Sequence, residues 1–262
     1  MDKFATELDA AALKDFLDEK AAFYENPVFI ETDPIQIPHQ FSKKQDIEIA
    51  ALLTALIAWG NRSSILKSAQ KIMTLMDGDP YGFVSQHSPK DLKVFEGFVH
   101  RTFQTVDLQF ILQALQSAYQ QEDSLEAYFI DPTGTHDYMA PNISRFREFL
   151  LRTPHQKRSE KHLANPLQGS AAKRLHMYLR WMVRPAKKGV DFNLWKKIPP
   201  AKLSCPLDVH SGNVARKLGL LDRKQNDAKA VEQLDQQLRR LDPIDPVKYD
   251  FALFGLGVFE KF

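Results

Sequence analysis

Lys173 combines a reactive side chain with a place at the start of an expected helix. It follows the small-residue turn Gly169-Ser170-Ala171, which opens that helix. The uncovered backbone amides of a helix N-terminus bind phosphate, and a neutral lysine amine forms Schiff bases. Lys173 therefore suits covalent chemistry beside a bound phosphate. A solvated lysine in the first turn of an amphipathic helix explains the same pattern.

Asp208 stands at a second helix start, in the run Leu207-Asp208-Val209-His210. Aspartate is a favoured N-cap residue, and Gly219 suits the position just beyond the end of that helix. A carboxylate beside a helix N-terminus stays ionised at neutral pH, so it can stabilise positive charge that develops in a transition state. A plain helix cap is the alternative explanation.

The polar turn Gly60-Asn61-Arg62 joins two apolar segments. We expect it to connect two helices, with Ser63 or Ser64 as the N-cap of the second. Asn61 and Arg62 are then exposed polar groups at a helix junction, where they could contact a partner or only complete the turn.

The charge is strongly asymmetric along the chain. Residues 1–50 hold 11 acidic and five basic residues, whereas residues 152–202 hold 13 Lys and Arg against two acids. Such a basic block suits a polyanion, with nucleic acid as the first candidate. A solvated basic surface without a partner is the other interpretation.

Composition excludes several classes of protein. The chain has 262 residues, 44% hydrophobic and 26% charged, which is typical of a soluble globular protein. Its one cysteine excludes an internal disulfide and a four-cysteine metal centre built from this chain alone. We expect no metal and no cofactor. The polar N-terminus does not resemble a signal peptide, and the longest apolar run, residues 49–59, is too short to span a bilayer, so we expect a cytoplasmic location and no membrane contact.

The spacing of apolar residues predicts an all-α fold of two helical lobes. Residues 26–41, with three prolines, are expected to be an extended connection, and few runs alternate with a period of two, so no sheet is expected. We expect residues 1–45 to form an N-terminal helix and connection that pack on a main domain, residues 46–262. Helices are expected at Leu8–Tyr24, Asp46–Ala58, Ser63–Met76, Val106–Gln120, Ile143–Leu151, Gly169–Val183, His210–Leu218, Ala228–Leu241 and Tyr249–Phe259.

These segments together resemble the helix-hairpin-helix DNA glycosylases, the superfamily of endonuclease III and the 8-oxoguanine DNA glycosylases. The hairpin pattern of that superfamily, Leu-Pro-Gly-Val-Gly, one residue and Lys, is matched at Leu167, Gly169 and Lys173. Its Val-Asp-x-His pattern is similar to residues 207–210, and the order of polar turn, lysine and aspartate agrees. Gln168 and Ala171 depart from the hairpin pattern.

The resemblance implies a helix-hairpin-helix glycosylase-like domain over residues 46–262. It implies base-excision repair of double-stranded DNA with a flipped base, an oxidised purine being one candidate, by a glycosylase with AP-lyase activity. Lys173 and Asp208 are the implied catalytic residues, and we expect a monomer. The implied nucleic-acid-binding residues are Asn61, Arg62, Gly169, Ser170, Ala171, Arg174, Arg180 and His210.

Two other functions remain open from the residues. The first is a non-catalytic nucleic-acid-binding protein on the same scaffold. The second is a metal-dependent hydrolase that uses Asp208 and His210, although two ligands at this spacing are a thin metal signal. Trp181, Phe192 and Trp195 are candidate aromatics for a base pocket or, alternatively, part of the core.

Overall fold

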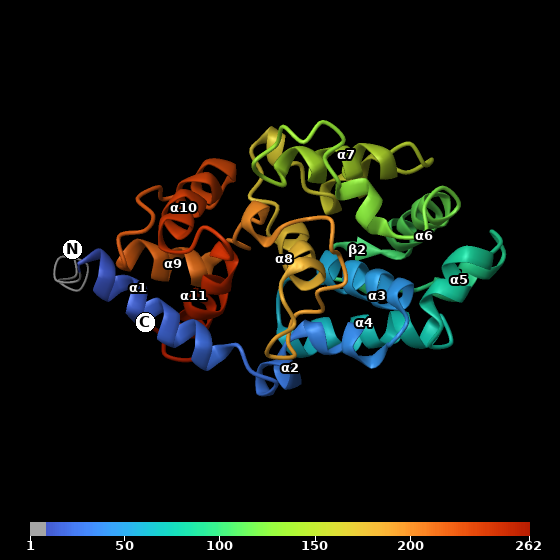
Figure 1. The fold of residues 1–262 in the computed structure, drawn as a ribbon. Helices are drawn as coiled ribbons and strands as arrows, with labels where there is room; N and C mark the ends of the chain where they lie inside the picture. Colours follow the sequence, from blue (N-terminus) through green and yellow to red (C-terminus); the bar gives the residue numbers. More distant parts are fainter. Residues whose placement is uncertain (1–8) are drawn as a thin grey trace. The chain divides into compact units, whose positions relative to one another are not determined.

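The computed structural model describes residues 9–262, and this part of the chain is mostly helical (Figure 1). It divides into two compact units, which are treated separately below. Unit 1 comprises the described residues up to Phe29, with residues 136–139 and 166–262, and unit 2 comprises residues 30–135 and 140–165. The chain passes from one unit to the other after Phe29, Thr135, Met139 and Asn165.

Unit 1 is built on five longer helices: α1 (Ala10–Tyr24), α8 (Lys173–Val183), α9 (Val209–Lys217), α10 (Ala228–Leu241) and α11 (Tyr249–Val258). Helix α11 is apolar on almost every side and lies between α1 and α9, which both pack along it (Figure 1). The core beneath them contains Leu17, Cys205, Leu207, Val214, Ala215, Leu234, Leu238, Tyr249, Leu253 and Leu256.

Unit 2 contains α3 (Lys44–Ile57), α4 (Arg62–Leu75), α5 (Pro80–Gln86), α6 (Thr105–Tyr119) and α7 (Ala140–Leu150). Helix α3 is buried over most of its length and packs on α4 and α5. Its fully buried Glu48 accepts hydrogen bonds from the Tyr119 hydroxyl at 2.8 Å and the Leu125 amide at 3.1 Å. A buried carboxylate needs such partners to remain in a core.

The expected helices are confirmed within a few residues, apart from the start of one of them. The helix after the small-residue turn begins at Lys173 and not at Gly169. Leu8, the expected start of the first helix, lies outside the described residues. None of the helices in the described part of the chain is both long and apolar enough to cross a membrane.

Two expectations about the non-helical segments are wrong. Residues 26–41 are not extended: α2 (Val28–Thr32) and two short 3-10 turns follow one another there, with Pro34 and Pro38 each opening a turn. Proline has the backbone angle that a helical first position needs, so these prolines start turns and do not only break helices. A two-stranded antiparallel hairpin, β1 (Val99–His100) and β2 (Phe103–Gln104), is also present.

Candidate functional site

The structure brings Lys173 and Asp208 together in unit 1. Lys173 Nζ lies 3.8 Å from Asp208 Oδ2, and the two side chains are 28% and 24% exposed. Lys173 is the first residue of α8, and Asp208 immediately precedes α9. The two groups that sequence spacing singled out therefore face one another at a solvent-accessible surface.

Asp208 uses its two carboxylate oxygens differently. Oδ1 caps α9 by accepting hydrogen bonds from the amides of His210 at 2.8 Å and Ser211 at 3.0 Å. The Ser211 hydroxyl in turn accepts from the Asp208 amide at 3.0 Å, which completes a capping box. Oδ2 is the oxygen that faces Lys173. The cap thus fixes the carboxylate while one oxygen remains directed at the amine.

The loop that precedes Lys173 is held by the start of α10. The Ala228 amide donates to the Gly169 carbonyl at 3.0 Å, and Ser170 forms an isolated bridge with Asp227. Gly169 has a φ of +92°, which favours glycine, and its side is open to solvent. Ala172 adopts a left-handed φ of +44° immediately before Lys173. Backbone strain of this kind is maintained only where neighbouring contacts hold the loop.

Asp250, a buried carboxylate that sequence analysis did not single out, lies in the first turn of α11. It is 5% exposed, and its Oδ2 accepts a hydrogen bond from Arg180 Nη1. Arg180, itself 4% exposed, also pairs with Asp191 at 3.4 Å and stacks over the Phe251 ring at 4.4 Å. Arg180 is therefore engaged inside unit 1, and we assign it to holding Asp250 rather than to contacting a nucleic acid.

A second buried arginine extends this network. Arg184 pairs with Asp191 at 2.6 Å, with Asp245 at 2.8 Å and with Glu25 at 3.0 Å. Glu25 lies at the end of α1, so these ion pairs join the N-terminal helix to α8 and to the segment before α11. Two of the 13 basic residues of the 152–202 block thus neutralise buried acids and do not contribute to a surface.

The remaining candidates near α8 divide between surface and core. His210 is exposed, and Arg174 is partly exposed, with burial lowering its pKa to about 10. Trp181 and Trp195 are fully buried, which confirms the alternative that they belong to the core. Phe192 is partly buried, and its amide donates to the Trp181 carbonyl at 2.8 Å.

Asn61 and Arg62 lie in unit 2. Asn61 is the N-cap of α4, accepting from the Ser64 amide at 3.2 Å, so the expectation that Ser63 or Ser64 is the cap is wrong. Arg62 donates to the Thr32 hydroxyl at 3.3 Å. Asn61 is exposed, and Arg101 at the tip of the hairpin packs directly against Gly60 beside it. Arg101 is a cation next to the polar turn that sequence reasoning missed, because only the fold brings it there.

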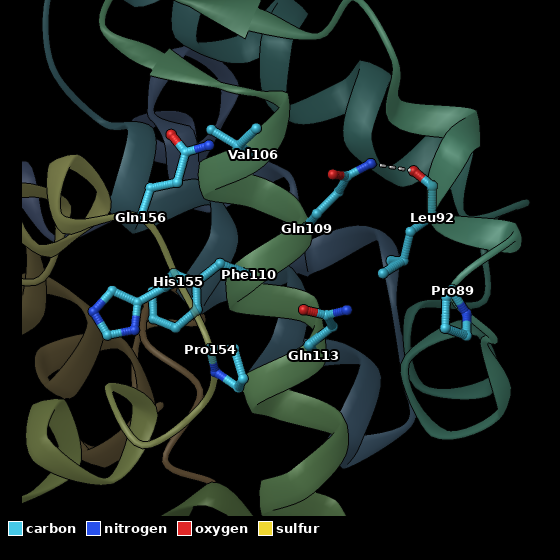
Figure 2. Close-up of a pocket in the computed structure, with 9 residues that line it drawn as sticks. All are labelled: Pro89, Leu92, Val106, Gln109, Phe110, Gln113, Pro154, His155 and Gln156. Atoms are coloured by element: carbon cyan, nitrogen blue, oxygen red, sulfur yellow. Dashed lines mark hydrogen bonds between the residues drawn. The ribbon is translucent and has the colours of Figure 1, made fainter.

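A pocket of about 270 Å³ opens on unit 2 beside α6 (Figure 2). His155 is the one ionisable side chain of its lining, and its Nδ1 lies 2.7 Å from the Thr153 carbonyl. Gln109 donates to the Leu92 carbonyl at 2.8 Å, as Figure 2 shows. The pocket has no carboxylate, lysine or cysteine in its lining, which is Pro89, Leu92, Val106, Gln109, Phe110, Gln113, Pro154, His155 and Gln156. The pocket therefore has neither the amine nor the carboxylate that the expected reaction needs, whereas unit 1 has both.

No group of three or more His, Cys, Asp and Glu side chains in residues 9–262 is arranged to hold a metal ion. Asp208 and His210 therefore have no third ligand from the described residues, and Asp208 Oδ1 is already occupied by the helix cap. No observation favours the metal-dependent hydrolase over a lysine-based reaction.

Comparison with known proteins gives a family and no further relatives. No curated protein and no solved structure matches the chain. A family described as "Protein of unknown function (DUF2400)" matches residues 33–259. This range includes Lys173, Asp208, Asp250 and the polar turn at Asn61, and it covers most of the chain, so the protein belongs to the DUF2400 family.

Proposed function

We propose that this protein is a DNA base-excision glycosylase with AP-lyase activity, acting on a damaged base that is flipped out of the duplex. The observation that carries the proposal is the 3.8 Å separation of Lys173 Nζ from Asp208 Oδ2 at an accessible surface. An amine nucleophile beside a carboxylate is the pair that this chemistry needs. An oxidised purine is the first base class to test.

The proposed reaction proceeds by attack of the Lys173 amine on the sugar C1′. The C1′–N bond breaks and the base departs with its electron pair, taking up the proton that the attacking nitrogen loses. The C1′–O4′ bond then breaks as the nitrogen lone pair forms an iminium, and O4′ takes up a proton from water. Loss of a C2′ proton to water finally expels the 3′ phosphate by β-elimination. Positive charge develops at the sugar during bond cleavage, and Asp208 Oδ2, 3.8 Å from Lys173 Nζ, is the group proposed to stabilise that charge.

The residues at the starts of α8 and α9 suit contact with the DNA backbone. The loop residues Gly169, Ser170 and Ala171 precede α8, and His210 is exposed in the first turn of α9. Backbone amides and neutral or cationic side chains at helix starts are common phosphate contacts. Asn61, in unit 2, is the residue proposed to fill the space that a flipped base leaves.

Borohydride trapping tests the proposal directly. The protein is mixed with duplexes that contain an abasic site or 8-oxoguanine, and reduction converts a Schiff base into a stable covalent adduct. We expect an adduct for the wild type, none for Lys173→Gln, and at least about 100-fold slower formation for Asp208→Asn, because loss of one electrostatic stabiliser typically costs that much. Lys196→Gln is the matched control, since Lys196 is an exposed lysine of the same unit.

The outcomes separate the two candidate functions. Tight, salt-sensitive binding to DNA with no adduct at any pH would instead support a non-catalytic nucleic-acid-binding protein. The exposed loop at Gly169 would then bind DNA without catalysing a reaction. An adduct that forms equally well in Lys173→Gln would contradict the assigned nucleophile. Absence of both adduct and binding would overturn both functions.

A further inference from the structure

The pocket of unit 2 has a floor formed by one face of α6. The spacing i, i+3, i+4 and i+7 places four of its lining residues on the same side of that helix: Val106, Gln109, Phe110 and Gln113. A segment between α5 and β1 forms one side of the pocket, and a segment between α7 and α8 forms the other, as Figure 2 shows. The volume of about 270 Å³ lies at the lower end of the range for ligand sites, which favours a ligand of a single ring system.

The chemistry of this lining disfavours charged ligands. No lysine, arginine, aspartate or glutamate stands among the nine lining residues. A phosphate, a carboxylate or a metal ion would therefore lose hydration in the pocket without meeting an opposite charge. Besides His155, the polar groups of the lining are the side-chain amides of Gln109, Gln113 and Gln156, and an amide offers both donors and an acceptor. The lining therefore suits an uncharged ring with polar edges.

Two glutamines on neighbouring turns of α6 supply hydrogen-bonding groups to the pocket. Gln109 Nε2 donates to the Leu92 carbonyl at 2.8 Å, which leaves Gln109 Oε1 as a fixed acceptor. The side chain of Gln113 is partly exposed and forms no hydrogen bond with any of residues 9–262, so its oxygen and both of its N–H groups are available. The two residues therefore offer two carbonyl oxygens and one free amide nitrogen from the same helix face.

His155 on the opposite side of the pocket is held in place by its neighbours. Its Nδ1 lies 2.7 Å from the Thr153 carbonyl, and because a carbonyl only accepts, Nδ1 carries the hydrogen. The centroid of its ring lies 4.8 Å from that of Phe110, and its Nε2 lies 3.7 Å from Glu160 Oε1. His155 and Gln109 are thus fixed before any ligand enters, which lowers the entropy cost of binding.

We propose that this pocket binds a nucleobase of the adenine type, one that carries an amino group next to a ring nitrogen, and that Gln113 recognises this edge of the base. A glutamine amide pairs with adenine through two hydrogen bonds, its oxygen accepting from N6 and its nitrogen donating to N7. The second hydrogen of N6 is available to Gln109 Oε1. The faces of the base pack against the apolar side chains of Leu92 and Pro154.

Adenosine and inosine test the proposal on the full chain without DNA. The two nucleosides share one ring system, but inosine has an oxygen where adenosine has the amino group, so the oxygens of both glutamines would face an acceptor. We expect one adenosine to bind per chain in isothermal titration calorimetry, and inosine to bind at least about fivefold more weakly. Equal affinities for the two nucleosides would overturn the proposal, as would an absence of adenosine binding up to millimolar concentrations.

A substitution at Gln113 locates the bound base. Gln113→Leu removes the amide at nearly constant size, and we expect it to weaken adenosine binding at least about fivefold. Gln120→Leu is the matched control, because Gln120 is an exposed glutamine at the end of the same helix and outside the pocket. This control should bind adenosine as the wild type does. A Gln113→Leu protein with wild-type affinity for adenosine would overturn the proposal.

A spectroscopic measurement on the wild type needs no substitution. Adenosine should shift the ¹H–¹⁵N signals of the Gln113 side-chain amide, while those of Gln120 should stay in place. Unmoved Gln113 signals at saturating adenosine would overturn the proposal. Neither Lys173 nor Asp208 takes part in this binding, so the borohydride experiment and the adenosine experiment can each fail while the other succeeds.

Discussion

Asn226 holds the backbone of Asp208 from outside the helix that Asp208 caps. The Asn226 side-chain amide donates to the Asp208 carbonyl at 2.8 Å, and its oxygen accepts from Arg216 on α9 at 2.5 Å. The loop between α9 and α10 therefore braces the start of α9, where the candidate acid lies.

Replacement of Asn226 should weaken both stability and chemistry. Asn226→Ala leaves the Asp208 carbonyl and the Arg216 guanidinium each without one partner, and we expect a loss of about 1–2 kcal/mol in the free energy of unfolding. Adduct formation should slow because Asp208 is less firmly held. Urea unfolding and borohydride trapping measure the two effects. Asn213→Ala, an exposed position on α9, should change neither.

Two substitutions at Asp208 should separate its structural role from its chemical role. Asparagine caps helices about as well as aspartate, so Asp208→Asn should unfold within about 0.5 kcal/mol of the wild type while losing most lyase activity. Asp208→Ala should lose activity and also about 1 kcal/mol of stability. Equal stability losses in the two variants, measured by denaturant unfolding, would contradict this division.

Gly255 of α11 lies directly against Tyr24 of α1. A Cβ at this position would overlap the ring of Tyr24, which is stacked on Phe259 and donates to Glu260 at 2.6 Å. We expect Gly255→Ala to destabilise the protein by about 1–3 kcal/mol despite the better helix propensity of alanine. The double variant Gly255→Ala with Tyr24→Ala should be more stable than the sum of the single changes predicts. Thermal or urea unfolding of the four proteins checks this.

Buried His176 should make the protein sensitive to acid. Burial lowers its pKa from 6.5 to about 4, with a smaller contribution from the charge of Arg239. Between these two values the unfolded chain binds the proton and the folded chain does not, so stability is lost as the pH falls from about 6.5 towards 4. The histidine that carries this effect is 2% exposed.

The comparison between His176→Leu and the wild type isolates this effect. The buried acid Asp235, with a pKa raised to about 6, acts in the opposite direction and is present in both proteins. The free energy of unfolding of both proteins is measured with urea at pH 7 and pH 5. We expect the wild type to lose more stability than His176→Leu when the pH falls from 7 to 5. An unchanged difference would rule out His176 as the source.

Local patterns predicted the helices and the candidate pair, because each depends on neighbouring residues. Lys173 follows a small-residue turn and begins α8, and Asp208 caps α9, so sequence spacing records both directly. Asp250 was not predicted, since its partner Arg180 is 70 residues away and only the fold joins them. Arg180 was expected to bind nucleic acid, and its burial was not predicted for the same reason: the sequence does not show which segments cover a helix.

The N-cap of α4 shows a second limit of prediction from the sequence. Asn61, Ser63 and Ser64 are all good N-cap residues within one turn, so propensity alone does not choose among them. The glycine before Asn61 has a φ of +96°, and this sharp turn sets where the helix begins.

The Cys205 thiol, which donates a hydrogen bond to Asp250, can report on the opening of unit 1. Cys205 is the one cysteine of the chain and is fully buried, and burial raises its pKa. An alkylating reagent can therefore modify it only when unit 1 opens around it. The rate of alkylation under native conditions would measure how often the core near the Lys173–Asp208 pair opens. The measurement needs no introduced label and has no competing thiol.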